Sequence, residues 1–387
     1  MGNILIFFGR ELWMGGILTG LFLFQLLFLR IVYSRPYRYT KRNKNKKSID
    51  VLPPVSIVVY AKNESENLRN NLPFLLTQDY PEYQVVVVND GSTDESEEVL
   101  KLLEAEHKYL YHTYIPEEAK YLSRRKLALT VGIKAAKYDT LLFTEANCRP
   151  LSPFWIKSMA SNFVEEKSIT LGFCSYIGNS GFFHRFVAYD NLLTGIQYLS
   201  AALVGSPFTG NGRNLAYRKE EFFKHKGYYH SLSLHAGDDD LFVNEVATGK
   251  NTQVEYAAES ITCMMPIERF SIWKEMKVSR AATRRYYKGW ALTRYRFDEV
   301  VLFLFLAMVI LSVCLAGNIL LIVYAVLLYL VLLVNKVIVF YKTAKLLQQK
   351  PIVFLFPLLE ICFPLFNLYV RIYRFFRGKN DYTFNLR

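Results

Sequence analysis

The chain has 387 residues, a net charge of +13 and 52% hydrophobic residues, which is long for one simple domain and apolar for a wholly soluble protein. Residues 30–47 hold eight basic and no acidic residues, whereas residues 48–266 hold 20 basic and 27 acidic residues. The positive charge is therefore absent from the central domain, which argues against nucleic-acid binding. The five cysteines form no close pairs, so neither a zinc site nor a disulfide framework is indicated.

Three uncharged apolar segments, residues 12–29, 300–315 and 319–333, have nearly the length needed to cross a bilayer. The basic run directly after the first segment predicts that this end, and with it the central domain, lies in the cytoplasm. A cleaved signal peptide is the alternative, but no basic region lies near the start and no small-residue cleavage site precedes the basic run. We therefore expect a multi-pass protein of the inner (plasma) membrane.

The central part alternates apolar, β-rich runs with helical patterns. Strands are expected at residues 55–60, 83–88, 109–114 and 140–144, and helices at residues 64–78, 94–106 and 123–137. This alternation predicts right-handed βαβ units and a parallel sheet, so the fold class is α/β with a Rossmann-like, nucleotide-binding layer.

The second half reads differently. An apolar, aromatic helix is expected at residues 182–204, a short strand at 215–217, and a helix at 238–248 whose first turn holds three aspartates. Residues 267–290 carry seven basic and two acidic residues among aromatic side chains, a composition typical of a helix on a membrane surface.

The last apolar segment, residues 352–370, contains Pro357, Glu360 and Pro364. A full crossing there would place the basic C-terminal residues outside, against the positive-inside rule, so we favour a re-entrant or interfacial hairpin over a third C-terminal membrane segment. Six parts are thus expected: a transmembrane helix (1–33), a basic linker (34–53), the α/β domain (54–265), an amphipathic interfacial helix (266–296), a transmembrane hairpin (297–345) and a re-entrant or third membrane segment with a basic tail (346–387).

Acidic residues follow two of the expected strands. An apolar run ends at Asn89 and Asp90, and another ends at Glu145. Ligands of open α/β sheets collect at the carboxyl ends of the strands, so both carboxylates should face one crevice. Three further aspartates, Asp238, Asp239 and Asp240, are adjacent; because like charges repel, at least one of them should have a raised pKa.

In their order and spacing these motifs resemble those of the family 2 glycosyltransferases of the membrane-anchored, bacterial type, which have a GT-A fold, over roughly residues 54–290. The resemblance rests on four segments: residues 54–64, Asn89 to Asp94, Gly210 to Arg218, and Gly237 to Leu241. It implies that Ala61, Asn63, Glu64 and Asp90 contact the nucleoside of a donor, that Gly210, Asn211 and Gly212 form an acceptor loop, and that Asp238, with Asp240 two residues on, supplies the catalytic base.

Two of the implied donor contacts have plain alternatives. Asp90 follows a strand, where it can accept hydrogen bonds from a nucleoside, or it can simply cap the following helix. Lys126 lies on the third expected helix, where it can approach a phosphate or belong to a solvated helix face beside Arg124 and Arg125.

The sequence departs from the family at the metal motif. The family has two aspartates flanking one residue, whereas this chain has Glu145, Ala146 and Asn147. Mg²⁺ and Mn²⁺ prefer oxygen ligands, and an asparagine oxygen brings less charge, so a divalent cation at Glu145 and Asn147 is expected to bind weakly.

A second departure is in the interfacial helix. Where the family often has Gln-x-x-Arg-Trp, residues 279–283 read Ser-Arg-Ala-Ala-Thr. Arg280, Arg284 or Arg285 is the candidate for the donor diphosphate, and a basic surface that only faces lipid headgroups is the alternative.

The sequence therefore predicts an inverting glycosyltransferase that moves a sugar from a nucleotide-sugar donor to a lipid or glycan acceptor at the membrane. Inversion is implied by the resemblance alone. Two alternatives stay open: a catalytically silent membrane scaffold that retains nucleotide binding, and another nucleotide-dependent membrane transferase.

Overall fold

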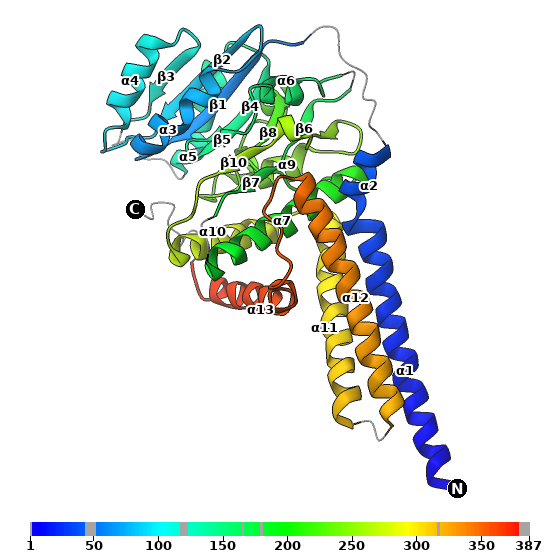
Figure 1. Ribbon diagram of the computed structural model, residues 1–387. Coiled ribbons are helices and arrows are strands. Elements are labelled where there is room, and N and C mark those ends of the chain that lie inside the picture. Colours follow the sequence, from blue (N-terminus) through cyan, green and yellow to red (C-terminus); the bar gives the residue numbers. More distant parts are fainter. Residues whose placement is uncertain are drawn as a thin grey trace.

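The computed structural model describes residues 2–42, 52–116, 123–164, 166–178, 181–315 and 318–378. A mixed α/β domain, residues 52–264 as described and here called the sheet domain, lies at one end of the molecule (Figure 1). A bundle of three long helices extends away from it.

The sheet domain is built on a seven-stranded sheet with the order β3-β2-β1-β4-β8-β6-β9. Its strands are β1 (Val55–Ala61), β2 (Tyr83–Asn89), β3 (Leu110–Tyr114), β4 (Thr140–Glu145), β8 (Leu215–Arg218), β6 (Ile169–Leu171) and β9 (Thr252–Val254). The first four pair in parallel, as the alternating pattern predicted. β8 runs antiparallel to β4 and β6, which makes the sheet mixed.

A second sheet of three strands was not expected. It consists of β5 (Cys148–Pro150), β10 (Thr262–Met264) and β7 (Cys174–Tyr176), with β10 in the centre. Strands of three residues are too short for a period-two pattern to be recognised in the sequence.

The helices of the sheet domain cover the strands. They are α3 (Ser65–Leu76), α4 (Ser96–Glu106), α5 (Arg124–Ala135), α6 (Trp155–Ala160), α8 (Lys219–Lys224) and α9 (Asp240–Val246). α5 packs on β1 and β2 at Gly132, where a Cβ would come within 2.7 Å of Val58 and 2.9 Å of Val88. Ser123 caps α5, its Oγ accepting the Lys126 N–H at 3.4 Å.

The bundle consists of α1 (Gly2–Phe28), α11 (Ala291–Leu315) and α12 (Ile319–Leu346), which lie side by side (Figure 1). Leu18, Phe22, Phe305 and Ala325 are buried between these helices, whereas many of the outward-facing apolar side chains are exposed. Exposed apolar surface of this extent is what a bilayer covers. A π-helical turn, Leu29–Tyr33, joins α1 to α2 (Arg35–Arg42).

Three more helices remain: α7 (Phe182–Leu203), which belongs to the sheet domain, and α10 (Phe270–Thr283) and α13 (Phe356–Phe375), which follow it in the chain. α13 packs against α10 and α7, and α10 and α13 both run across the direction of the bundle (Figure 1). The segment expected to form a hairpin is one continuous helix, with Pro357 in its first turn and Pro364 inside it. A buried ion pair of 2.5 Å between Glu360 and Lys336 holds this helix to α12.

With α13, four helices among the described residues are long and apolar enough to cross a membrane by length and composition. One of them is N-terminal and three are C-terminal. Whether α13 crosses the bilayer or lies in its surface stays a prediction.

Candidate active site

The carboxyl ends of β1, β2 and β4 bring the expected acidic residues to one edge of the sheet. β2 ends at Asn89 and β4 at Glu145. Asp90 follows β2, and its backbone N–H donates to the Ala61 carbonyl at 2.8 Å. Since β1 pairs with both neighbouring strands, Asp90 and Glu145 emerge at the same edge of the sheet.

Asp90 is almost completely buried, and both of its carboxylate oxygens have partners. Oδ1 accepts hydrogen bonds from Arg124 at 2.8 Å (Nε) and 2.7 Å (Nη2). Oδ2 accepts the Tyr60 hydroxyl at 2.8 Å. Asp90, Tyr60 and Arg124 therefore form one hydrogen-bonded group. A nucleoside that binds to Asp90 would also contact Arg124, which is more exposed than Asp90.

The turn after β1, which carries two of the expected nucleoside contacts, is tied to the loop after β2. Asn63 has a positive φ of 52°, an uncommon conformation that asparagine tolerates better than most residues. Its Oδ1 accepts the Thr93 N–H at 2.8 Å, and its own N–H donates to Ser92 Oγ at 2.8 Å. The Glu64 N–H donates to Ser96 Oγ at 3.0 Å. The two loops thus form one polar wall next to Asp90.

Arg125 connects the end of β4 to the aspartate motif. Its Nη2 lies 2.7 Å from Glu145 Oε1 and its Nε lies 2.8 Å from Asp238 Oδ2. A second arginine, Arg213, donates to the other Glu145 oxygen at 2.8 Å. Burial by itself raises the pKa of Glu145, but the charges and hydrogen bonds of Arg213 and Arg125 outweigh it and lower this pKa to about 2.

The three adjacent aspartates have different surroundings. α9 begins at Asp240 with Asp239 as its N-cap, so the expected helix starts two residues late and Asp238 lies outside it. Asp238 and Asp240 are buried, and Asp239 is partly exposed. Burial, together with the charges of Asp238 and Asp240, raises the pKa of Asp239 to about 6.

The expected base, Asp238, stays a prediction, and the three aspartates differ in their partners. Asp238 is paired with Arg125. Asp240 Oδ2 accepts the hydroxyls of Tyr287, at 2.8 Å, and of Thr283, which ties α9 to the end of α10. Asp239 accepts only the backbone N–H groups of Gly212 and Asp240 among the contacts of the described residues. Among the three aspartates, Asp239 therefore combines a pKa that is raised toward neutrality with a partly exposed side chain that another molecule can reach.

The expected acceptor loop lies directly against Asp239. The Gly212 N–H donates to Asp239 Oδ2 at 2.9 Å, and a Cβ at Gly212 would come within 3.3 Å of the Asp239 side chain. At Gly210 a Cβ would lie 2.9 Å from Val243 on α9. Asn211 is buried between them and accepts the Arg213 N–H at 3.2 Å. Both glycines thus allow the loop to pack closely on α9.

One of the three diphosphate candidates is near this group. Arg280, on α10, lines a small cavity together with Asn211 and Arg213, and its charge lowers the pKa of Asp239 in part. Arg284 follows α10 in a short 3₁₀ turn and does not line this cavity. The geometry therefore favours Arg280.

Lys126 does not face the site. Its ammonium group is buried and donates to the carbonyls of Ser231 and Leu234, at 2.5 and 3.0 Å, and to Ser231 Oγ at 3.0 Å. Burial lowers the pKa of Lys126 to about 8. The expectation that it approaches a phosphate is wrong, because this face of α5 points into the protein.

The neighbouring residues of α5 take that place. Consecutive helical residues point in different directions, so Arg124 and Arg125 face the strand ends while Lys126 turns inward. Together with Arg213 they are the site residues that the sequence analysis did not select. The only signal in the sequence was the adjacent pair of arginines.

A divalent cation fits poorly among these side chains. Glu145 has no free oxygen, because Arg125 and Arg213 each take one. The described residues contain no group of three or more His, Cys, Asp or Glu side chains arranged to hold a metal ion. Mg²⁺ is usually held by one or two carboxylates together with waters and substrate phosphates, so a cation at Glu145 would compete with Arg125 and Arg213 for its oxygens.

Known proteins resemble this chain in sequence and in fold. Residues 56–222 match the model of glycosyl transferase family 2. Poly-beta-1,6-N-acetyl-D-glucosamine synthase of Staphylococcus aureus (strain COL) is 25% identical over 115 residues, 30% of this chain and 27% of that protein. The protein of the same name from Staphylococcus epidermidis is 28% identical over 93 residues, 24% of this chain and 21% of that protein. The aligned part is about a quarter of these relatives' length.

The fold extends over more of the chain. A mannosyltransferase of Pyrobaculum calidifontis, solved with GDP-Man and Mn²⁺, matches with a TM-score of 0.55 and 15% identity over 92% of this chain and 99% of that one. This likeness shows that the sheet domain has a GT-A fold.

Proposed function

We propose that the protein transfers a sugar from a nucleotide-sugar donor to a lipid or glycan acceptor at the cytoplasmic face of the inner (plasma) membrane, with inversion. The observation that carries this proposal is Asp239. It is partly exposed, its pKa is raised to about 6 by burial and by the charges of Asp238 and Asp240, and it lies against the loop at Gly212. A carboxylate with these properties is suited to remove the proton of an acceptor hydroxyl near neutral pH.

The donor side follows from the strand ends. We place the nucleoside against Asp90 and against the turn that carries Ala61, Asn63 and Glu64. The polar groups of this turn and of Asp90 can form hydrogen bonds with the base and the ribose. The diphosphate then faces the guanidinium groups at Arg125, Arg213 and Arg280. Preorganised positive charge of this kind stabilises a diphosphate leaving group as its negative charge develops.

The chemical step needs two changes at the sugar. The acceptor oxygen forms a bond to the anomeric carbon while the bond from that carbon to the diphosphate breaks, and the acceptor proton moves to Asp239. A single displacement with the base on the acceptor side inverts the anomeric centre. In this scheme the chain's own arginines provide the charge stabilisation, and a divalent cation reaches Glu145 only if Arg125 or Arg213 releases an oxygen.

The membrane acceptor is supported by the arrangement of the helices. Asp240 joins the aspartate motif to Thr283 and Tyr287 at the end of α10. α10 carries basic and aromatic residues and packs on α13, so the proposed acceptor side adjoins the helices that we assign to the membrane surface. The relatives aligned above are polysaccharide synthases by name, which supports a lipid or glycan as the acceptor class.

A silent scaffold is the second candidate, because Asp90, Glu145 and Asp238 are already paired with arginines. A panel of nucleotide sugars separates the two. The full chain, reconstituted in vesicles, is incubated with UDP-GlcNAc, UDP-glucose or GDP-Man, with and without Mn²⁺, and the released nucleoside diphosphate is measured. Release that depends on Asp239 supports the enzyme. Binding of UDP or GDP without any release, across the panel and with membrane extract added, would establish the scaffold.

A further inference from the structure

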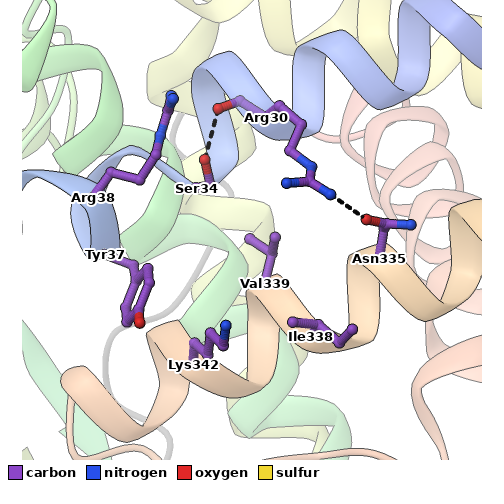
Figure 2. A pocket seen from close by; sticks show the side chains of 8 residues that line it. All are labelled: Arg30, Ser34, Tyr37, Arg38, Asn335, Ile338, Val339 and Lys342. Carbon is purple, nitrogen blue, oxygen red and sulfur yellow. Dashed lines mark hydrogen bonds between the residues drawn. The ribbon is translucent and has the colours of Figure 1, made fainter.

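A groove lies far from this site, where the π-helical turn between α1 and α2 faces α12 (Figure 2). Its volume is about 680 Å³. It is lined by Arg30, Ser34, Tyr37, Arg38, Asn335, Ile338, Val339 and Lys342. None of these residues lines the cavity beside Arg280, so the groove is a separate feature.

Three cations and no carboxylate line this groove. Arg30 reaches across from α1 to α12, where its Nη2 donates to Asn335 Oδ1 at 2.7 Å (Figure 2). Arg38 donates to the Ile31 carbonyl at 3.3 Å, and Lys342 lies 5.4 Å from the centre of the Tyr37 ring. Among the residues that the structure describes, no acidic side chain forms an ion pair with any of the three. Like charges around one groove repel, so an anion bound between them is favoured.

The groove also has an apolar side. Ile338 is 45% exposed and, with Val339, lies on α12 between Asn335 and Lys342. Asn335 and Lys342 are seven residues apart, so they are separated by about 10 Å along the helix. A soluble anion would contact only the cations and leave this apolar surface in water. A molecule with a phosphate at one end and a hydrocarbon chain at the other covers both.

We propose that this groove binds an anionic membrane phospholipid, with the phosphate between Arg30, Arg38 and Lys342 and an acyl chain along Ile338 and Val339. The position supports it, because the groove lies at the end of the bundle next to the sheet domain, where the basic run indicates the cytoplasmic leaflet. Anionic lipids are attracted to that side by basic residues close to the membrane.

Such a lipid would hold the bend between α1 and α2 against α12. α2 packs on α7, and the Pro36 carbonyl accepts the Tyr256 hydroxyl of the sheet domain at 3.0 Å. The bound lipid would thus fix how the sheet domain is seated on its membrane helices. This inference does not depend on sugar transfer.

The test uses the full chain in a neutral detergent, with lipid binding measured by native mass spectrometry. The probes are dioleoyl phosphatidylglycerol and dioleoyl phosphatidylcholine. The wild type should retain phosphatidylglycerol in preference to phosphatidylcholine. The double variant Arg30→Gln, Lys342→Gln should lose about 25-fold of this affinity, since each basic contact near a membrane is worth about fivefold.

The matched control is Arg35→Gln, Lys345→Gln, which removes two positive charges from α2 and α12 outside the groove. It should change the affinity by about twofold or less, because surface charges outside a contact add little. A third variant, Ile338→Trp, fills the apolar side without changing the charge and should also reduce retention.

Three results would overturn the proposal. Equal losses in the two double variants would show attraction to juxtamembrane charge in general. Retention of phosphatidylcholine as strong as that of phosphatidylglycerol would show that the phosphate environment is not selective. Displacement of the lipid by excess inorganic phosphate, with full retention in Ile338→Trp, would show a free-anion site. Circular dichroism and gel filtration establish that each variant is folded.

Discussion

The guanidinium of Arg125 donates to Glu145 at 2.7 Å, and through Nε it also contacts Asp238 at 2.8 Å. One side chain from the start of α5 thus joins the end of β4 to the loop before α9. Arg125 lies between Glu145 and Asp238, and its positive charge competes with that of a divalent cation for Glu145. The stability of the site and its response to metal ions therefore depend on the same residue.

Replacing Arg125 by glutamine should destabilise the sheet domain by about 3 kcal/mol, because it leaves the buried Asp238 without its partner and Glu145 with only one of its two arginines. The measurement is chemical denaturation of the purified chain in detergent, followed by tryptophan fluorescence. Arg69→Gln is the control, since Arg69 pairs with Glu95 where both side chains are largely exposed. An exposed pair of this kind contributes less than about 1 kcal/mol. Equal losses in the two variants would contradict a structural role for Arg125.

Asp239→Asn should lower kcat by about 100-fold or more, because it removes the proposed general base, and should leave nucleotide affinity within about twofold. Asp238→Asn should have a smaller effect on kcat, since Asp238 acts through Arg125. Both rates are measured with the donor that the panel identifies. If Asp238→Asn is the more damaging of the two, the base assignment from the sequence was correct and the one proposed from the structure is wrong.

The pKa of Asp239, raised to about 6, predicts the pH dependence of transfer. The base works only when unprotonated, so kcat/KM should fall about tenfold per pH unit below about pH 6 and reach a plateau above it. Burial and the charges of Asp238 and Asp240 cause the shift, so Asp238→Asn should move the midpoint to lower pH. A profile that stays flat from about pH 5 to pH 8 would exclude Asp239 as the base.

Asp90→Ala should weaken binding of the nucleoside diphosphate by about 10-fold to 100-fold, the effect of removing a charged hydrogen-bond partner. Isothermal titration with UDP or GDP measures it. Asp79→Ala is the control, because Asp79 is exposed in the loop before β2. Asp90→Asn keeps the shape and separates loss of binding from loss of folding. Unchanged affinity in folded Asp90→Ala would remove Asp90 from the donor site.

Asn147→Asp should tighten Mn²⁺ binding, because it adds a second carboxylate two residues from Glu145. Both oxygens of Glu145 are already paired, with Arg125 and Arg213. In the wild type we expect turnover to change by less than about threefold when Mn²⁺ is removed by chelation, since preorganised guanidinium groups provide the charge. Turnover is measured over a series of Mn²⁺ concentrations, with Asn147→Ser as the control. Identical Mn²⁺ curves for all three proteins would show that position 147 is not a ligand.

Much of the fold could be predicted because its signals are local. The apolar run at β2 and the alternation with helices such as α5 identify parallel strands without knowledge of any contact. Uncharged segments at α11 and α12 likewise identify membrane helices. The three-residue strands of the second sheet carry no such pattern, and the prolines of residues 352–370 suggested a break that α13 does not have, because Pro357 lies in the first turn, where proline is tolerated.

The site was predictable only in its outline. The sequence by itself determined that Asp90 and Glu145 lie at the carboxyl ends of strands, since the apolar runs before them fix where each strand stops. It did not determine the partner of each carboxylate: Arg125 and Asp238 are 113 residues apart, and Lys126, adjacent to Arg125, turns into the protein instead. Proton affinity depends on burial and on charges brought together from distant segments. Only the tertiary structure therefore decided which arginines pair with Asp90, Glu145 and Asp238 and which charges surround Asp239.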